Sequence, residues 1–370
     1  MLFRHDSNGV TFSLVVDDFG VKYTERAGAQ HLIDTLLGCG YELSIDWDGA
    51  KYLGLTIEFA SDRQSIAISL PGYIDKVLKQ HAPYINTGTA SPAVYTSPSY
   101  GARQQLVSSD SSAPLCKSEA SRLRGIVGSI LYYARAVDST MLPAVTTLAS
   151  LQARPTAAVM AQANRLLQYC FRYPSNRLIL HACDMQLHVQ SDASFNSRPR
   201  GRSVAGSFFY LGNHDHPEHI NGAVHCISKV IDVVVGSVGE AEYAALYIAG
   251  VEATSLQQML QSLGYMQSPT TMLCDNKFAV GLGSSSVKAK HSKAIDVKFY
   301  WIRDRVRRKQ FNLVWREGKL NLADFFTKPL PVKVHQQLMP FFVDCSVVAH
   351  PSAAHIRHTA FLARRSTSTN

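Results

Sequence analysis

The feature that most constrains the fold of this 370-residue chain is the order of strand and helix patterns between residues 183 and 331. Short apolar patterns predict three consecutive strands near 186–193, 203–211 and 222–230. The patterns that follow predict a helix near 238–263, a strand near 270–275, a short helix, a long basic helix near 289–309, a strand near 311–316 and a last short helix. This order indicates a mixed α/β fold, in which helices cover the faces of a mixed sheet.

Four acidic residues lie on separate predicted elements of this region: Asp192, Glu242, Asp275 and Asp324. Carboxylates from separate elements can converge at one end of a sheet, where they repel one another unless cations neutralise them. Hard divalent cations, Mg²⁺ above all, suit such oxygen ligands. Two such ions about 4 Å apart can activate a water molecule and stabilise the leaving oxygen of a phosphodiester.

Two of the four acidic positions also have structural explanations. Asp275 follows a predicted strand and could cap the next helix, and Asp324 could interact with a helix N-terminal dipole. Glu240 competes with Glu242 for a chemical role. The segment from Ser237 to Glu240 fits a capping box, which gives Glu240 a sufficient structural role.

Five motifs, SDASF, EAEYAAL, CDN, KHSKAIDVKFYWIRD and NLADFFTKPL, follow one another between Leu187 and Leu330. In this order they resemble the ribonuclease H domain of copia-type LTR retrotransposon polyproteins. The resemblance implies a five-stranded mixed sheet in the order 3-2-1-4-5 and a metal-dependent endoribonuclease that cuts the RNA strand of RNA–DNA hybrids. It assigns catalysis and the binding of two Mg²⁺ ions, with Mn²⁺ as a substitute, to Asp192, Glu242, Asp275 and Asp324, and so favours Glu242 over Glu240.

The first 85 residues contain a second acidic pattern. Residues 10–24, VTFSLVVDDFGVKYT, predict two strands joined by a tight turn in which two aspartates could simply be solvated. With KYLGLTIEF and ISLPGYIDKVLKQ, this segment resembles the end of a reverse-transcriptase palm and the start of its thumb. The resemblance implies that Asp17 and Asp18 bind metal only in a complete polymerase. Its other aspartate is expected upstream, so we predict no RNA-directed DNA polymerase activity from this chain alone and regard the upstream part as a partner.

The resemblance, together with the composition of the linker and the tail, implies five segments along the chain. They are the end of the palm and thumb (1–85), a Ser-, Thr-, Pro- and Gly-rich linker (86–117), a helical connection without chemistry (118–182), the ribonuclease H domain (183–331) and a mobile tail (332–370).

The predicted helix near 289–309 is strongly basic. Residues 288–309 contain nine Lys or Arg against two Asp, which accounts for most of the net charge of +9. Such a run is usually a solvated face, but next to a nuclease site we favour contact with phosphates. The residues expected to bind nucleic acid are Lys288, Lys290, His291, Lys293, Lys298, Arg303, Arg307 and Arg308.

Three further features limit the functional prediction. The HDHPEH stretch at 214–219 resembles a metal site, but a polar loop is expected between two strands. Residues 315–324 lack a histidine that many ribonucleases H carry there, which leaves the proton-transfer partner unassigned. The alternative to a nuclease is a non-catalytic retrotransposon remnant that binds nucleic acid.

The location is predicted from cysteine content and from resemblance. Seven cysteines without a CxxC pair indicate reduced thiols, and no signal peptide or transmembrane segment is apparent. We therefore expect an intracellular protein without membrane contact. The resemblance implies the cytoplasm, in a virus-like particle, with the nucleus as a second location.

Overall fold

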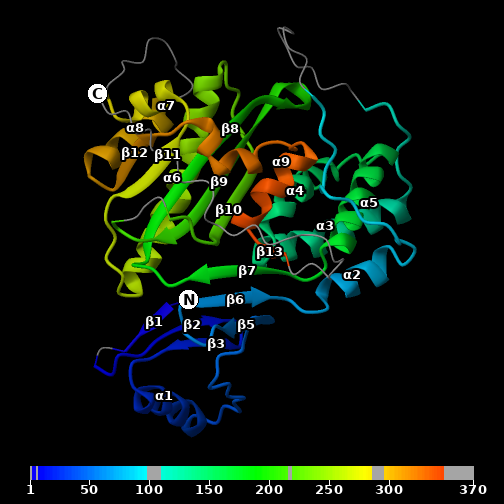
Figure 1. Ribbon diagram of the computed structural model, residues 1–370. Helices are drawn as coiled ribbons and strands as arrows, with labels where there is room; N and C mark the ends of the chain where they lie inside the picture. Colours follow the sequence, from blue (N-terminus) through cyan, green and yellow to red (C-terminus); the bar gives the residue numbers. More distant parts are fainter. Residues whose placement is uncertain (1, 6, 98–109, 216–218, 286–295, 346–370) are drawn as a thin grey trace, which may run out of the picture.

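The computed structural model describes residues 2–5, 7–97, 110–215, 219–285 and 296–345 (Figure 1). Its second half contains a five-stranded sheet in the order β10-β9-β8-β11-β12. The strands are β8 (Gln186–Arg198), β9 (Arg202–Gly212), β10 (Ala223–Val230), β11 (Thr270–Cys274) and β12 (Phe311–Trp315). β8, β9 and β10 pair antiparallel, whereas β8, β11 and β12 pair parallel. The expected ribonuclease H-like mixed sheet with the order 3-2-1-4-5 is therefore confirmed.

The alternation along β8 determines which side chains meet each face of this sheet. Leu187 and Val189 are buried in one core, so Gln190 and Asp192 face the opposite side. β11 pairs with β8 in a register that places Leu273 beside Gln190. Continuing this register by two residues brings Asp275 beside Asp192.

Helices cover both faces of the sheet, in agreement with the expected fold class (Figure 1). On one face, α6 (Val238–Ser262), α7 (Lys277–Gly283) and α8 (Asp296–Arg307) contribute to a core with the strands. On the other face, Phe208 and Tyr210 of β9 share a core with α3 (Lys117–Ala136), α4 (Leu142–Leu151) and α5 (Ala157–Arg172). Among the described helices, none combines enough length with enough apolar residues to span a bilayer.

The three helices expected between residues 118 and 173, which we call the connection helices, are present, and their apolar faces explain their packing. In α3, the predicted face formed by Leu123, Ile126, Val127 and Ile130 is completely buried. Because this core includes side chains of β9, the connection helices form the second layer over the sheet rather than a separate body.

A second five-stranded sheet, in the order β13-β7-β6-β5-β4, joins distant parts of the chain. It contains β4 (Lys51–Tyr52), β5 (Leu55–Phe59), β6 (Ser65–Ser69), β7 (Asn176–His181) and β13 (Asp344–Cys345), and all its pairs are antiparallel. Helix α2 (Tyr73–His81) follows β6. The hairpin of β5 and β6 is thus anchored to a distant part of the chain by pairing between β6 and β7.

The N-terminal residues form a small outer unit (Figure 1). It comprises a three-stranded sheet of β1 (Leu2–Arg4), β2 (Thr11–Val15) and β3 (Asp18–Lys22), followed by α1 (Arg26–Gly38). Val15 pairs with Asp18, so Val16 and Asp17 form the tight turn that the sequence predicted.

The residues after 331 correct the expectation of a mobile tail. They form α9 (Val332–Leu338), a 3₁₀ turn at Met339–Phe341 and β13. His335, Met339, Phe342 and Val343 are buried. The tail hypothesis failed because single apolar side chains in a short segment give no clear periodicity. Residues 346–370 of the predicted tail lie outside the described residues.

The buried His335 predicts a pH-dependent stability. Burial lowers its pKa to about 4, and its Nε2 lies 3.1 Å from the Tyr169 hydroxyl. Between this pKa and the unfolded value of about 6.5 the unfolded chain binds the extra proton, so His335 makes stability fall as the pH falls. In urea unfolding, the free energy of unfolding of the wild type should fall between about pH 7 and pH 5. In His335→Gln this fall should be smaller by about 2 kcal/mol. Equal losses in both proteins would contradict a neutral buried His335.

Candidate active site

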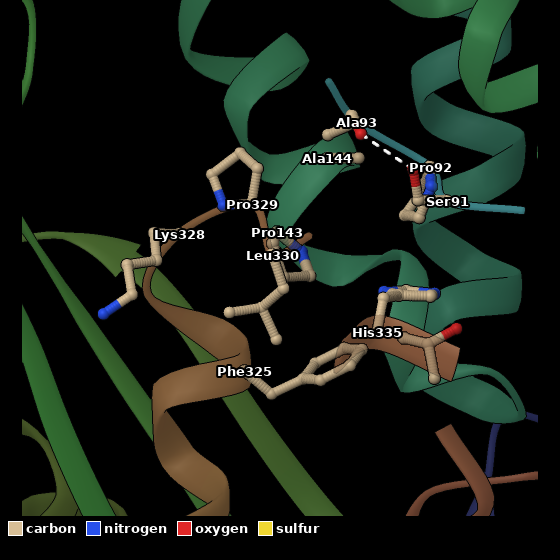
Figure 2. Close-up of a pocket in the computed structure, with 11 residues that line it drawn as sticks. Ser91, Pro92, Ala93, Pro143, Ala144, Phe325, Lys328, Pro329, Leu330 and His335 are labelled. Atoms are coloured by element: carbon tan, nitrogen blue, oxygen red, sulfur yellow. Dashed lines mark hydrogen bonds between the residues drawn. The ribbon is translucent and has the colours of Figure 1, made fainter. Parts of the chain in front are cut away.

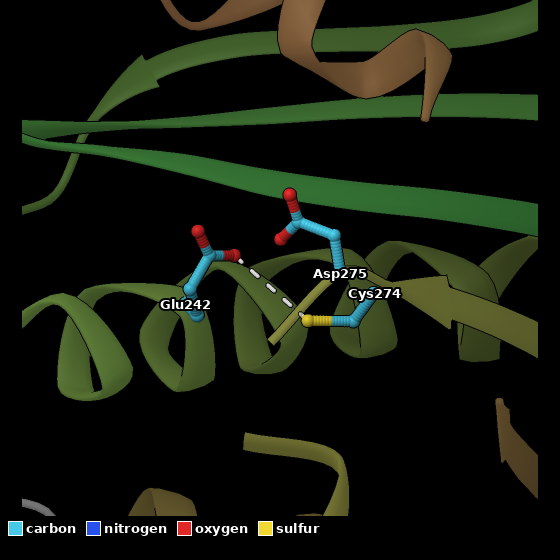
Figure 3. Close-up of side chains that lie close together, drawn as sticks. All are labelled: Glu242, Cys274 and Asp275. Atoms are coloured by element: carbon cyan, nitrogen blue, oxygen red, sulfur yellow. Dashed lines mark hydrogen bonds between the residues drawn. The ribbon is translucent and has the colours of Figure 1, made fainter. Parts of the chain in front are cut away.

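The four predicted acids come from four elements that meet where β8 and β11 run side by side. Asp192 lies in β8 opposite Gly206 of β9, Glu242 lies near the start of α6, Asp275 directly follows β11, and Asp324 lies in the 3₁₀ helix η4 (Leu322–Phe326). Ligand atoms of Glu242, Cys274 and Asp275 all lie within 4.8 Å of one another (Figure 3). Within the described ranges, this is the one group of three metal-ligating side chains at such spacing.

Side-chain hydrogen bonds hold η4 against β8 and so position Asp324. The Asn321 amide Nδ2 donates to the Ser191 carbonyl oxygen over 2.8 Å, and the Leu322 backbone N–H donates to Gln190 Oε1 over 2.7 Å. The Thr327 hydroxyl donates to Asp192 Oδ2 over 3.0 Å. These contacts tie both ends of η4 to the strand that carries Asp192.

Gly206 permits the close approach of η4 to the neighbouring strand β9. A Cβ atom at this position would lie 2.6 Å from the Ala323 carbonyl oxygen and 2.7 Å from Thr327 Cγ2. Both distances are shorter than van der Waals contact. The strand opposite Asp192 therefore requires a residue without a side chain at this point.

Local contacts show that helix capping does not account for Asp275. The cap of α7 is Asn276, whose Oδ1 accepts from the Ala279 N–H over 3.0 Å. The carbonyl oxygen of Asp275 accepts from the Trp315 indole N–H over 2.8 Å. The backbone is thus fixed by β12 while the carboxylate stays in the cluster.

Glu240 and Glu242 have different surroundings. Glu240 lies at the start of α6, where its Oε2 accepts from the Gly236 N–H over 2.7 Å and its own N–H donates to Ser237 Oγ. Glu242 is only 4% exposed and accepts a hydrogen bond from the Cys274 thiol over 3.8 Å. Contacts at the start of α6 therefore account for Glu240, whereas Glu242 is part of the acidic cluster.

Burial and repulsion from neighbouring carboxylates both raise the pKa values of Asp192, Glu242 and Asp275. Burial is the larger cause for Asp192, whose pKa is raised further by the charges of Asp324 and Asp275. Burial likewise raises the pKa of Glu242, with Asp192 and Asp275 adding to it, and the pKa of Asp275, with Asp324 adding to it. Ionised carboxylates in this arrangement repel one another, so a bound cation would stabilise the site.

Lys328 lies at the edge of the cluster. Its Nζ is 2.5 Å from Asp324 Oδ1. Burial acts to lower the pKa of Lys328, but the charges of Asp324, Asp192 and Asp275 outweigh it, so the pKa is raised.

Sequence reasoning did not identify Thr327, Lys328 or Cys274 as neighbours of the acids. A signal for the first two was present, because residues three and four positions after Asp324 lie on the same face of a helical turn. Cys274 gave no signal, since a cysteine at the end of an apolar strand is usually only a core residue.

Other predicted site residues lie outside the cluster or outside the described residues. Asp17 and Asp18 are exposed at the turn between β2 and β3. Arg303 donates to Ser285 Oγ, and Arg307 and Arg308 pair with Asp304. Lys288, Lys290, His291 and Lys293 lie outside the described residues, as does the side chain of Lys298. In the HDHPEH stretch, the exposed His214 contacts Asp215 at 3.1 Å, and residues 216–218 are not described.

Comparison with known sequences gives relatives among retrotransposon polyproteins. No protein-family model matches the chain. The Retrovirus-related Pol polyprotein from transposon TNT 1-94 of Nicotiana tabacum is 24% identical over 88% of this chain and 24% of its own length. The transposon RE1 polyprotein of Arabidopsis thaliana is 29% identical over 58% of this chain and 14% of its own length. The Ty1-ER2 Gag-Pol polyprotein of Saccharomyces cerevisiae is 24% identical over 89% of this chain and 19% of its own length.

Solved structures with partial similarity include two kinds of protein. The N-terminal RNase H domain of a Mycobacterium tuberculosis protein has a TM-score of 0.30 at 17% identity, covering 38% of this chain and 95% of that chain. A foamy viral protease-reverse transcriptase in complex with dsDNA has a TM-score of 0.43 at 13% identity, covering 83% of this chain and 55% of that chain.

The sequence matches extend through both halves of the chain. The chain spans about a quarter or less of the length of the curated relatives it matches. Two of them nevertheless align with nearly nine-tenths of this chain. The chain is therefore homologous, over most of its length, to the Pol polyproteins of retrotransposons.

Proposed function

We propose that this chain hydrolyses the RNA strand of RNA–DNA hybrids as the ribonuclease H of a copia-type retrotransposon reverse transcriptase. The observation that carries the proposal is the meeting of Asp192, Glu242, Asp275 and Asp324 from four separate elements on a ribonuclease H-like sheet. Homology to retrotransposon Pol polyproteins supports the same activity.

The residues of the cluster fit divalent cations. Four carboxylates supply hard oxygen ligands, which Mg²⁺ and Mn²⁺ prefer. Asp192 and Glu242 are 5% and 4% exposed, and their raised pKa values show that nearby positive charge is insufficient to offset burial. We propose that the four acids hold two Mg²⁺ ions, which supply activation of the attacking water and stabilisation of the departing 3′ oxygen.

The other residues of the site position these ligands. Thr327 fixes one oxygen of Asp192 by donating to it, and Trp315 fixes the backbone of Asp275. Asp275 and Asp324 are partly exposed, whereas Asp192 and Glu242 form the buried floor. A phosphodiester would therefore approach from the side of Asp275 and Asp324. Hybrid recognition would depend on groove shape and contacts to 2′-hydroxyl groups.

The direct test is incubation of the full chain with end-labelled RNA–DNA hybrid, with double-stranded DNA and double-stranded RNA as parallel substrates. We expect cleavage of only the RNA strand of the hybrid, in the presence of Mg²⁺ or Mn²⁺ and not with EDTA. Binding of the hybrid without cleavage under any of these conditions would favour the non-catalytic remnant.

We further propose that the exposed side of α8 contacts phosphates. Arg307 and Arg308 have side chains 81% and 66% exposed, and both lie beside Asp304. Ile302 is buried and Val306 packs against the same core, so the apolar side of α8 faces inward. The arginines are thus held on the outer side of the domain that carries the acidic cluster.

Replacing Arg303, Arg307 and Arg308 together with glutamine should weaken hybrid binding and flatten its salt dependence. Each lost phosphate contact should reduce the log–log salt slope by about 0.9, the value for a B-form duplex. Filter binding at several salt concentrations measures this slope. A matched control replaces the exposed Lys117, Arg154 and Lys333, which removes the same charge elsewhere. Equal slopes in both triple variants would contradict a binding role for α8.

The polymerase part of the chain remains a proposal. Asp17 and Asp18 would bind metal when the upstream part of the reverse transcriptase supplies the remaining ligand. Within the described residues they do not belong to a group of three potential metal ligands. We propose that primer extension requires that upstream part.

A further inference from the structure

Lys328 is a cationic side chain in direct contact with the carboxylate cluster. Its ammonium group lies 2.5 Å from Asp324 Oδ1, and the charges of Asp192 and Asp275 act on it as well. Thr327, its neighbour in the chain, contacts Asp192. Residues 324, 327 and 328 therefore present a carboxylate, a hydroxyl and an ammonium group toward one site.

We propose that Lys328 is an internal counter-cation of the cluster, which divalent ions displace from Asp324 when they bind. The inference rests on the metal site in the proposed function. In addition, competition from this lysine lowers the affinity of the site for divalent ions. The ammonium group is a compact point charge on a flexible stem, so it can neutralise one carboxylate without satisfying the other ligands.

The ammonium group of Lys328 is directed away from the apolar side chains beside it. Lys328 lines a small cavity of about 20 Å³ together with Phe325, Leu330 and His335. Figure 2 shows its ammonium group pointing away from Phe325 and His335. Its side chain is 47% exposed, which leaves room for the ammonium group to move toward solvent while the backbone stays in place.

Competition follows from the position of the contact. A divalent ion held by Asp324 needs a carboxylate oxygen, and Lys328 contacts one of the two. The alternative is that Lys328 only orients Asp324 for the ion. The two roles predict opposite effects when the charge is removed, because loss of a competitor strengthens cation binding and loss of an orienting contact weakens it.

Isothermal titration calorimetry of the full chain with MgCl₂ distinguishes these roles without measuring activity. For Lys328→Gln we expect a Kd for Mg²⁺ about two- to fivefold lower than wild type, the upper part of the range for release of a half-exposed competing ion pair. Lys328→Arg retains the charge and should stay within about twofold of wild type. The matched control is Lys319→Gln, which removes an 88% exposed charge from the segment just before η4 and should leave the Kd unchanged.

Several outcomes would overturn the inference. These are an unchanged or higher Kd in Lys328→Gln, an equal decrease in Lys319→Gln, and no binding of Mg²⁺ by wild type. Near-ultraviolet circular dichroism identifies a misfolded variant, and Lys328→Met then supplies the same charge removal with a different side chain. The outcome is separable from the proposed nuclease function. If Lys328→Gln binds Mg²⁺ more tightly while wild type leaves hybrids intact, the counter-cation stands and the nuclease proposal fails.

Discussion

Replacement of Asp275 by asparagine should abolish cleavage of RNA–DNA hybrids while the protein stays folded. The change removes one ligand charge at nearly constant size. Loss of a group that merely supports a metal ligand costs about 10- to 100-fold, so loss of a ligand should cost at least about 100-fold. The Trp315 contact to the backbone of residue 275 does not depend on the carboxylate, so the position of β12 should be preserved.

The same substitution should not lower stability in the absence of metal. The charge of Asp275 raises the pKa values of both Asp192 and Glu242, which means that the three acids repel one another when ionised. Removing one charge relieves this repulsion, so the midpoint of urea unfolding in EDTA should stay equal or rise. Loss of activity with equal or greater stability indicates a functional ligand, because replacement of a structural residue would lower both activity and stability.

The measurement is single-turnover cleavage of a labelled hybrid, with urea unfolding on the same preparations. Asp232→Asn is the matched control, because it removes an identical charge from an exposed position that pairs only with Lys229 among the contacts described. Asp232→Asn should cleave at the wild-type rate. Cleavage by Asp275→Asn at that rate would show that the assigned site is wrong.

The strand pattern of the second half could be predicted because it is local. The observed bounds of β9, β10, α6, β11 and β12 differ from the predicted ranges by one residue or less at each end. Alternation and apolar runs report burial along a single element, which is sufficient to identify each strand. That β8 and β11 lie side by side follows only from the strand order. The strand order came from the family resemblance and not from the local pattern.

The remaining features depend on contacts between residues far apart in the chain. The bonds from Asn321 to Ser191 and from Leu322 to Gln190 span more than a hundred residues, and no local pattern predicts them. The pairing of β6 with β7 likewise joins the hairpin of β5 and β6 to the segment before the ribonuclease H-like sheet. The residues after 331 were misjudged for the same reason, since β13 is recognisable only through its partner β7.

The contact between Gly206 and η4 is a further long-range feature, and it predicts a large effect from a small change. In Gly206→Ala, the new methyl group would overlap the Ala323 carbonyl oxygen at 2.6 Å and Thr327 Cγ2 at 2.7 Å. Because the first of these is a backbone atom, a side-chain rotation cannot relieve the overlap. η4 must move away from β9 and would carry Asp324 and Thr327 away from Asp192.

Two consequences should follow for Gly206→Ala. Overpacking of this kind destabilises a protein by about 1–3 kcal/mol. Displacement of a catalytic group by about 1 Å can reduce the rate by about 100-fold, so cleavage should fall to a similar extent even where the variant is fully folded. Both effects are measurable by urea unfolding and single-turnover cleavage at a temperature well below the unfolding transition.

Gly128→Ala provides the matched control for this prediction. Gly128 lies within α3, and a Cβ atom there would meet no atom within 4 Å. The same chemical change should therefore raise stability by about 0.5–1 kcal/mol, as expected for alanine in place of glycine inside a helix, and leave cleavage unchanged. If Gly206→Ala instead behaves like Gly128→Ala in both assays, η4 does not lie against β9 in solution, and the position assigned to Asp324 beside Asp192 must be abandoned.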